Sequence, residues 1–235
     1  MQAIETVYPK SGRRGRPPIG AERMLRLYCI QLWFGLSDEG VEDALYDSAA
    51  FRRFVGIDLR TERAPDSTTL LKFRRLLETH DLTRALLDGV NAGMQERRLL
   101  LKRGTLIDAT IIAAPSSTKN AQGTRDPEMR STKKGNNWHF GLKLHIGVDA
   151  ESGLAHTGVT TAAHAADVSH VTELLHGEEA DVFADAGYTG VDKRDEVTAA
   201  QQDGRIAPNV NWHVATKRSL IKKRPDGLGN PSSTF

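Results

Sequence analysis

Several features that mark common protein classes are missing from this sequence. Cys29 is the only cysteine, which excludes an internal disulfide and a thiolate zinc site and indicates a reducing compartment. No apolar run approaches the roughly 18 residues that a membrane-spanning helix needs. The segment that follows Met1 also lacks the apolar core of a signal peptide. We therefore expect a protein of the cytoplasm.

Net charge is nearly absent as well, at +2, but the charges form blocks. Lys and Arg outnumber Asp and Glu by six to two in residues 1–28, ten to three in 97–148 and six to one in 205–235. Residues 149–204 reverse this, with two against twelve. Basic blocks beside an acidic one favour a polyanionic partner and a cation-binding site in one molecule. Solvated faces of mixed sign explain the charges equally well.

The first part of the chain has helical periodicity. Residues 9–20 are rich in Gly, Arg and Pro and predict an extended arm, which either lies along phosphates or is a disordered leader. Ser37 and Asp66 are placed to cap helices. The expected apolar stripes are Met24, Leu25, Tyr28, Leu32 and Trp33, then Leu70, Phe73, Leu76 and Leu77, then Leu82, Leu86, Val90 and Met94. Such helices suit a helix-turn-helix module, although a plain helical bundle is the commoner outcome.

From about residue 99 the period changes to two, which is typical of strands. Residues 106–112 predict a buried strand, residues 116–137 an exposed polar loop, and residues 140–148 a strand with alternating apolar side chains. Asp149 is expected in the turn of a hairpin whose second strand covers residues 154–161. A helix, a strand ending at Asp185, another helix and a strand at residues 210–214 follow. The order predicts a mixed sheet with helices packed on it.

Two aspartates are the candidate site. Asp108 interrupts the apolar run of residues 106–112, and Asp185 ends the run that begins at Val182. An ionised carboxylate among apolar neighbours is costly unless a cation compensates it. If the two strands lie side by side, the pair could bind a divalent metal such as Mg²⁺, which takes one or two carboxylates plus water and phosphate. A role as a strand-end cap or turn residue is the alternative for each.

At two runs the sequence resembles DDE transposases of bacterial insertion sequences. The runs are Lys133-Lys134-Gly135-Asn136-Asn137-Trp138-His139-Phe140-Gly141-Leu142-Lys143-Leu144-His145-Ile146-Gly147-Val148-Asp149 and Leu175-His176-Gly177-Glu178-Glu179-Ala180-Asp181-Val182-Phe183-Ala184-Asp185-Ala186-Gly187-Tyr188. Residues 24–77 are similar to the helical domain of that family. The resemblance extends over nearly all of the chain to about Arg218.

The resemblance implies an α/β fold in which an all-helical domain precedes a ribonuclease-H-like mixed sheet with flanking helices. It implies a basic arm at 1–20, a helical DNA-binding domain at 21–98, a catalytic domain at 99–218 and an irregular tail at 219–235. In that fold the first catalytic acid lies on the first strand and the second at the end of the fourth, which maps them onto Asp108 and Asp185.

The implied chemistry is hydrolysis at transposon ends with Mg²⁺ or Mn²⁺, followed by attack of the freed 3′-hydroxyl on target DNA. The partners would be the terminal inverted repeats, the target DNA and a second copy in a homodimer, in a bacterial cytoplasm near the nucleoid. The expected DNA-binding residues are Arg13, Arg14, Arg16, Lys72, Arg74, Arg75, Lys133, Lys134 and Lys143.

The sequence departs from the family pattern near its end. The family carries a third catalytic acid, a Glu, on a helix after the fifth strand, whereas only Asp226, in an expected turn, follows the strand at 210–214 here. We therefore expect a truncated catalytic domain with impaired strand transfer, since losing a metal ligand lowers activity. The alternative function is an inactive DNA-binding protein that occupies transposon ends and regulates an intact copy.

Overall fold

A computed structural model describes residues 1–10, 18–119 and 123–216. The chain forms two compact units, residues 1–90 and 91–235. The expected domain boundary between residues 98 and 99 stays a prediction. No helix in the described part of the chain is long and apolar enough to cross a membrane.

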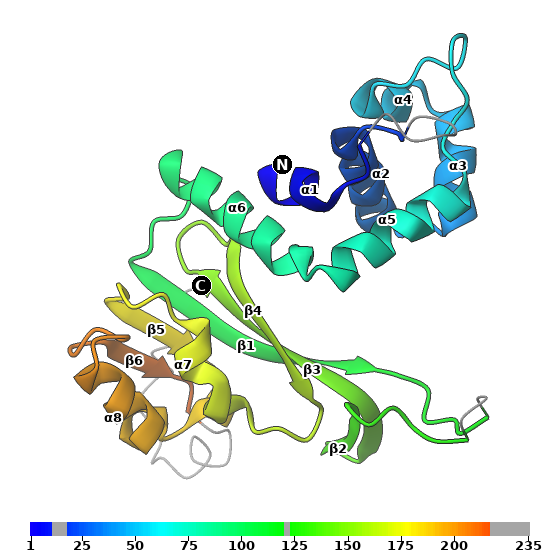
Figure 1. Ribbon diagram of the computed structural model, residues 1–235. Coiled ribbons are helices and arrows are strands. Elements are labelled where there is room, and N and C mark those ends of the chain that lie inside the picture. Colours follow the sequence, from blue (N-terminus) through cyan, green and yellow to red (C-terminus); the bar gives the residue numbers. More distant parts are fainter. Residues whose placement is uncertain (11–17, 120–122, 217–235) are drawn as a thin grey trace, which may run out of the picture. The chain divides into compact units, whose positions relative to one another are not determined.

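The first unit is all-helical, as the periodicity predicted. Ser37 and Asp66 each cap a helix, accepting hydrogen bonds from Gly40 N at 2.9 Å and Thr69 N at 2.7 Å. The helices are α1 (Gln2–Val7), α2 (Ala21–Phe34), α3 (Asp38–Asp47), α4 (Ala49–Val55), α5 (Ser67–Thr79) and α6 (Leu82–Glu96), the last of which crosses the boundary between the units (Figure 1). Helix α1 was not expected from the sequence.

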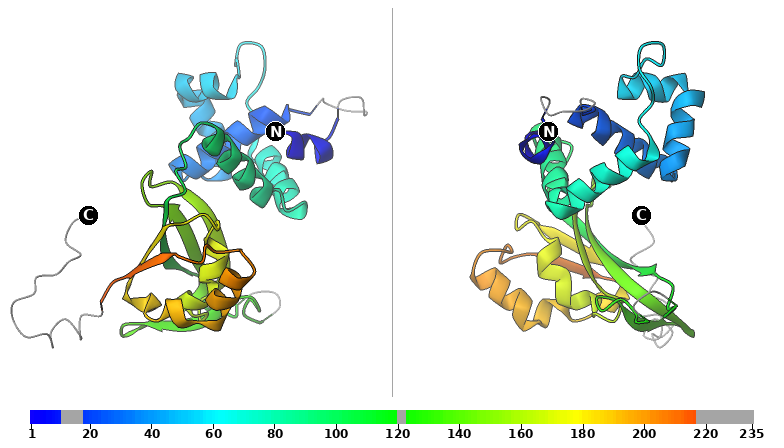
Figure 2. Two further views of the ribbon diagram at one scale, coloured as in Figure 1. Left: turned by 90° about the vertical axis from the view of Figure 1, so that its left-hand side faces the viewer. Right: turned by 45° about the vertical axis from the view of Figure 1, so that its right-hand side comes forward.

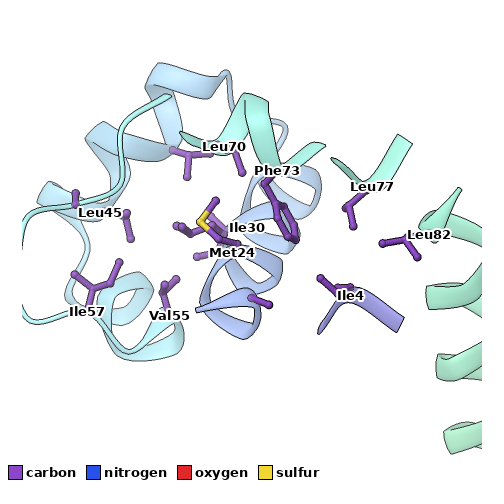
Figure 3. Packing of buried hydrophobic residues seen from close by; sticks show 14 residues of the cluster. Ile4, Met24, Ile30, Leu45, Val55, Ile57, Leu70, Phe73, Leu77 and Leu82 are labelled. Carbon is purple, nitrogen blue, oxygen red and sulfur yellow. The ribbon is translucent and has the colours of Figure 1, made fainter. Parts of the chain in front are cut away.

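The core of the first unit corrects the stripe predicted for α2. The helix buries Met24, Leu27 and Ile30, whereas Leu32 and Trp33 are 61% and 66% exposed. The observed side chains recur every three residues and contact α5 through Leu70 and Phe73, which belong to the same cluster (Figure 3). The sequence pattern failed here because Leu25, Leu32 and Trp33 are apolar without being core residues, and exposed apolar side chains are common in proteins.

The second unit is a mixed six-stranded sheet with helices, which confirms the predicted fold class. Its strands run in the order β2-β3-β1-β5-β6, and β4 also pairs with β3. Strands β1, β5 and β6 are parallel, while β3 is antiparallel to β1, β2 and β4. The strands are β1 (Gly104–Ala113), β2 (Arg130–Lys134), β3 (Asn137–Asp149), β4 (Ala155–Ala162), β5 (Asp181–Ala184) and β6 (Asn211–Val214).

Helices cover one face of this sheet. The short helix η1 (Asp167–His170) leads into α7 (Val171–Leu174), and η2 (Ala186–Tyr188) and η3 (Val191–Lys193) precede α8 (Asp195–Gln202). Val171, Leu174 and Val197 pack with Ile107 and Val182 in one buried cluster. Figures 1 and 2 show α7 and α8 on the same side of the strands.

Two sequence predictions for the sheet were wrong in detail. Strand β1 is not buried throughout, because Leu106 and Asp108 are exposed while Ile107 is buried against the helices. The predicted polar loop at 116–137 contains β2. On β3 the helix-covered face carries His145 and Gly147, which are buried, whereas the apolar residues of the alternation lie on the other face and stay half-exposed. We call that second face the open face.

Candidate functional site

The register of two parallel strands places the two candidate aspartates next to each other. Strand β1 pairs with β5 from Gly104 opposite Asp181 to Ile107 opposite Ala184. The next residue after this last pair is Asp108 on β1 and Asp185 after β5. Neighbouring strands lie about 4.8 Å apart, and residues in register point to the same face. Residues that are distant in the sequence therefore meet at the end of β5.

Each carboxylate is held by one backbone amide and remains exposed. Ala109 N donates to Asp108 Oδ1 at 2.7 Å, and Gly187 N donates to Asp185 Oδ1 at 2.8 Å. Asp185 caps η2 in this way, so the alternative role of a cap is also fulfilled. In both side chains the second oxygen makes no hydrogen bond within the described residues, and both residues are exposed, which leaves these oxygens available to a ligand.

A side chain at residue 187 would press on the carboxylate of Asp185. A Cβ atom at Gly187 would lie 2.9 Å from Asp185 Oδ1, closer than real Cβ contacts allow. The carboxylate of Asp185 would therefore have to shift from its present position if residue 187 carried a side chain. The Asp-Ala-Gly-Tyr segment is thus a local structure in which the glycine positions the acid.

Tyr188 is a neighbour of the pair that the sequence did not single out. Its side chain is 1% exposed, and its buried hydroxyl has no hydrogen-bond partner among the described residues. Burial raises the pKa of Tyr188, and the charges of Asp167, Asp108 and Asp185 raise it further. The hydroxyl therefore stays protonated at neutral pH, in the negative field of these three carboxylates.

An ion pair, largely buried on its lysine side, includes one of these carboxylates. Lys143 on β3 is 12% exposed in its side chain, and its Nζ lies 2.7 Å from Asp167 Oδ1. The same ammonium group donates to Ala165 O at 2.6 Å. The cation compensates one of the three negative charges around Tyr188. Lys143 is therefore engaged inside the protein, although the resemblance placed it at a DNA surface.

Two family models match the chain. Residues 100–228 match the model described as "Transposase DDE domain", and residues 1–76 match the one described as "Transposase domain (DUF772)". The first match alone covers more than half of the 235 residues. The chain belongs to the DDE transposase family. Enzymes of this family carry out DNA transposition by cutting and joining phosphodiester bonds, and they use divalent metal ions.

One solved structure in the comparison is the "Crystal structure of a pre-cleavage Mos1 transpososome". The match has 9% sequence identity and covers 83% of this chain and 77% of that chain. Its TM-score of 0.25 is too low to establish a common fold. The family assignment of this transposase therefore depends on the sequence models.

The donor set of the acid pair fits a divalent metal ion. Asp108 and Asp185 offer exposed carboxylate oxygens in adjacent register positions, and Mg²⁺ commonly binds one or two carboxylates with water and substrate phosphate completing its shell. No group of three or more His, Cys, Asp or Glu side chains that could hold a metal occurs among the described residues of the transposase. The protein donors that the structure brings together are thus these two carboxylates.

The other residues expected to contact DNA have different environments. Arg74 forms a two-pronged ion pair with Asp38, at 2.7 and 2.9 Å, and donates to Gln31 at 3.1 Å, so it stabilises the helical unit. Lys72 and Arg75 are exposed on α5. Lys133 and Lys134 are exposed on β2. Arg13, Arg14 and Arg16 lie outside the residues that the structure describes.

Lys72 also lines a cavity of about 530 Å³ in the helical unit, together with Arg63, Asp66 and Tyr46. The residues that line the cavity carry both positive and negative charges, so the cavity does not indicate one class of ligand. The sequence gave no signal for this cavity, because its walls come from α3, α5 and the loop between α4 and α5.

Proposed function

We propose that this transposase cleaves DNA at the ends of its element and transfers the cut strand into target DNA, with Asp108 and Asp185 holding Mg²⁺ or Mn²⁺. The observation that supports this most is the register of β1 and β5, which makes the two acids neighbours. When bound, the metal activates the attacking oxygen and stabilises the leaving oxygen at the phosphate.

The residues of the chain have distinct parts in this proposal. The backbone amides of Ala109 and Gly187 each bind one oxygen of the two carboxylates, so that the other oxygen of each has no hydrogen-bond partner among the described residues. Lys143 neutralises Asp167, which reduces the repulsion that crowded carboxylates create around Tyr188. The proposed DNA contacts are the exposed Lys72, Arg75, Lys133 and Lys134 and the arm residues Arg13, Arg14 and Arg16. We also propose a homodimer acting on paired ends in the bacterial cytoplasm, at the nucleoid.

The test is cleavage of a duplex that contains one terminal inverted repeat, with Mg²⁺ or Mn²⁺. We expect nicking at the repeat end that Asp108→Asn and Asp185→Asn each abolish while DNA binding remains. Asp203→Asn is the matched control, because Asp203 is an exposed aspartate of the same unit that pairs with Arg205. Nicking that survives both site substitutions would remove the acid pair from the proposal.

The alternative function is a regulator that binds transposon ends without cutting them. It follows from the sequence hypothesis that the third catalytic acid is missing. The same assay separates the two functions: binding to the repeat without nicking, in either metal, supports the regulator. Nicking without strand transfer supports an impaired enzyme. Binding should weaken as salt rises in both cases, because phosphate contacts release counterions.

A further inference from the structure

The β2–β3 hairpin is the part of the second unit that the sequence did not predict. Strand β2 pairs with the start of β3 from Arg130 opposite Gly141 to Lys134 opposite Asn137. The turn contains Gly135 at φ +61°, a conformation that favours glycine. The pairing of β5 with β1 ends at Ile107, whereas β1 and β3 continue together to Ala113 opposite Gly141, where β2 also joins β3 (Figure 1).

The two strands of the hairpin carry cations and no acid. Residues 129–148 contain no Asp or Glu, although the exposed Asp126 and Glu128 precede them, and Lys133 and Lys134 are exposed without an ion-pair or hydrogen-bond partner among the described residues. Arg130 donates to the carbonyls of Pro127 and Met129. The guanidinium of Arg125 lies 5.4 Å from the centroid of the Phe140 ring. A segment with cations and no acids is complementary to phosphates and repels acidic protein surfaces.

Trp138 stands on this hairpin with 71% of its surface exposed, more than any other large hydrophobic residue described. It pairs with Lys133 across the two strands, so the indole and the ammonium group share one face. Among the described residues, the indole ring of Trp138 makes no contact with another aromatic ring. Tryptophan is enriched where a flat apolar surface meets a partner, and its ring can stack on a base or pack against sugars.

The same face leads to the acid pair. Side chains of a strand alternate, so Trp138, Leu142 and Ile146 of β3 lie on one face, and Ile146 is opposite Asp108 on β1. That face is the open face of the sheet. Along β3 the step from residue 138 to residue 146 covers about 27 Å, which is the length of about eight base pairs of DNA.

We propose that the tip of this hairpin contacts the duplex that enters the site, at most about eight base pairs from the cleaved phosphate. Lys133 and Lys134 bind phosphates, and Trp138 packs against sugars or base edges in the minor groove. This inference rests on the proposed function, since it takes DNA as the substrate at Asp108 and Asp185. It adds the location of a second contact and a role for Trp138.

The first experiment measures binding of a 60-base-pair duplex that spans the end of the element, as a function of salt and without metal. Substituting both Lys133→Ala and Lys134→Ala should reduce the slope of log K against log salt by about 1 to 2. Trp138→Ala should lower affinity about tenfold without changing the slope, and Trp138→Phe should retain most of the affinity. Lys193→Ala is the control, because Lys193 is exposed on the same unit. Hairpin variants that bind like this control would overturn the proposal.

The second experiment locates the contacts. Cys29 is the only cysteine, so Cys29→Ser gives a background in which Trp138→Cys or Asp108→Cys can carry a tethered iron chelate that cuts nearby DNA. We expect two clusters of cuts separated by no more than about eight base pairs. Cuts from position 108 with none from position 138 would overturn the hairpin contact alone. No cuts from position 108 would overturn the proposed function.

A change in the self-association of the protein would also count against the proposal. If Trp138→Ala changed the mass measured by light scattering while DNA affinity stayed the same, the indole would belong to an interface between copies of the chain. The hairpin would then not be a DNA contact.

Discussion

At the scale of single residues, the surroundings of Asp108 and Asp185 come from elements that are distant in the sequence. Burial raises the pKa of Tyr188 on η2, and the charges of Asp167, Asp108 and Asp185 raise it further. Asp167 is in turn paired with Lys143 of β3. Backbone register, which decides which side chains are neighbours, depends on tertiary pairing that a local sequence pattern does not contain.

Asp149 was expected in the turn of the hairpin, but it is the last residue of β3, and its carboxylate accepts hydrogen bonds from the turn that follows. Burial alone would raise its pKa, but hydrogen bonds from Ser152, Lys102 and Leu101 outweigh burial and lower the pKa to about 2. Its Oδ2 accepts from the amides of Leu101 and Lys102 at 2.8 and 2.9 Å. The carboxylate therefore ties the segment before β1 to the β3–β4 turn.

Asp149→Asn should lower the free energy of unfolding by about 2 kcal/mol at pH 7, because the pKa of this group is lower in the folded chain than in the unfolded chain. A depressed pKa stabilises the protein above the unfolded value of 3.8, and this stabilisation is lost as pH falls towards about 2. Urea unfolding between pH 7 and pH 3 measures the difference. Glu151→Gln, an exposed neighbour, should have little effect, and an equal loss in both variants would contradict this explanation.

Tyr188→Phe should leave the free energy of unfolding unchanged or raise it by about 1 kcal/mol, since it removes a buried hydroxyl without a partner. Urea unfolding of the two proteins gives the answer directly. A loss of more than about 1 kcal/mol would show that the hydroxyl donates a hydrogen bond whose removal is costly.

At the scale of elements, the helix caps and the succession of the longer strands along the chain were predictable, whereas the buried face of a strand was not. Ser37 and Asp66 capped helices as expected, because a cap is a local interaction. The alternation in β3 predicted a strand without showing which face is buried, and the helices cover the side that carries His145 and Gly147. The small size of Gly147 explains this, because α7 needs a close approach at that position.

Gly147→Ala tests the close packing of β3 against α7. A Cβ at Gly147 would lie 2.5 Å from Leu174 O, a backbone atom that cannot move without shifting α7. We expect a loss of about 2 kcal/mol in the free energy of unfolding. Gly158→Ala on β4 is the control, because its added Cβ would meet only Leu144 Cδ1, at 3.7 Å. Equal stabilities of the two variants would show that β3 and α7 are not packed as described.

At the scale of the whole molecule, the two units correspond to the two family matches, at residues 1–76 and 100–228. The change from helical to strand periodicity near residue 99 was visible in the sequence. The β2–β3 hairpin was not, because a short exposed strand of Arg, Ser, Thr and Lys has no apolar alternation to mark it. Surface elements of this kind are formed by pairing with a longer neighbour.

If Asp108 and Asp185 act together on one divalent metal site, as we propose, Mn²⁺ binding shows it independently of DNA. Titration followed by the paramagnetic resonance of free Mn²⁺ should show a site in the unaltered chain. Asp108→Asn and Asp185→Asn should each weaken Mn²⁺ binding about tenfold or more, and the double variant should bind little more weakly than either single one, because each acid needs the other. Equal Mn²⁺ affinity in all four proteins would show that the two acids do not form a metal site.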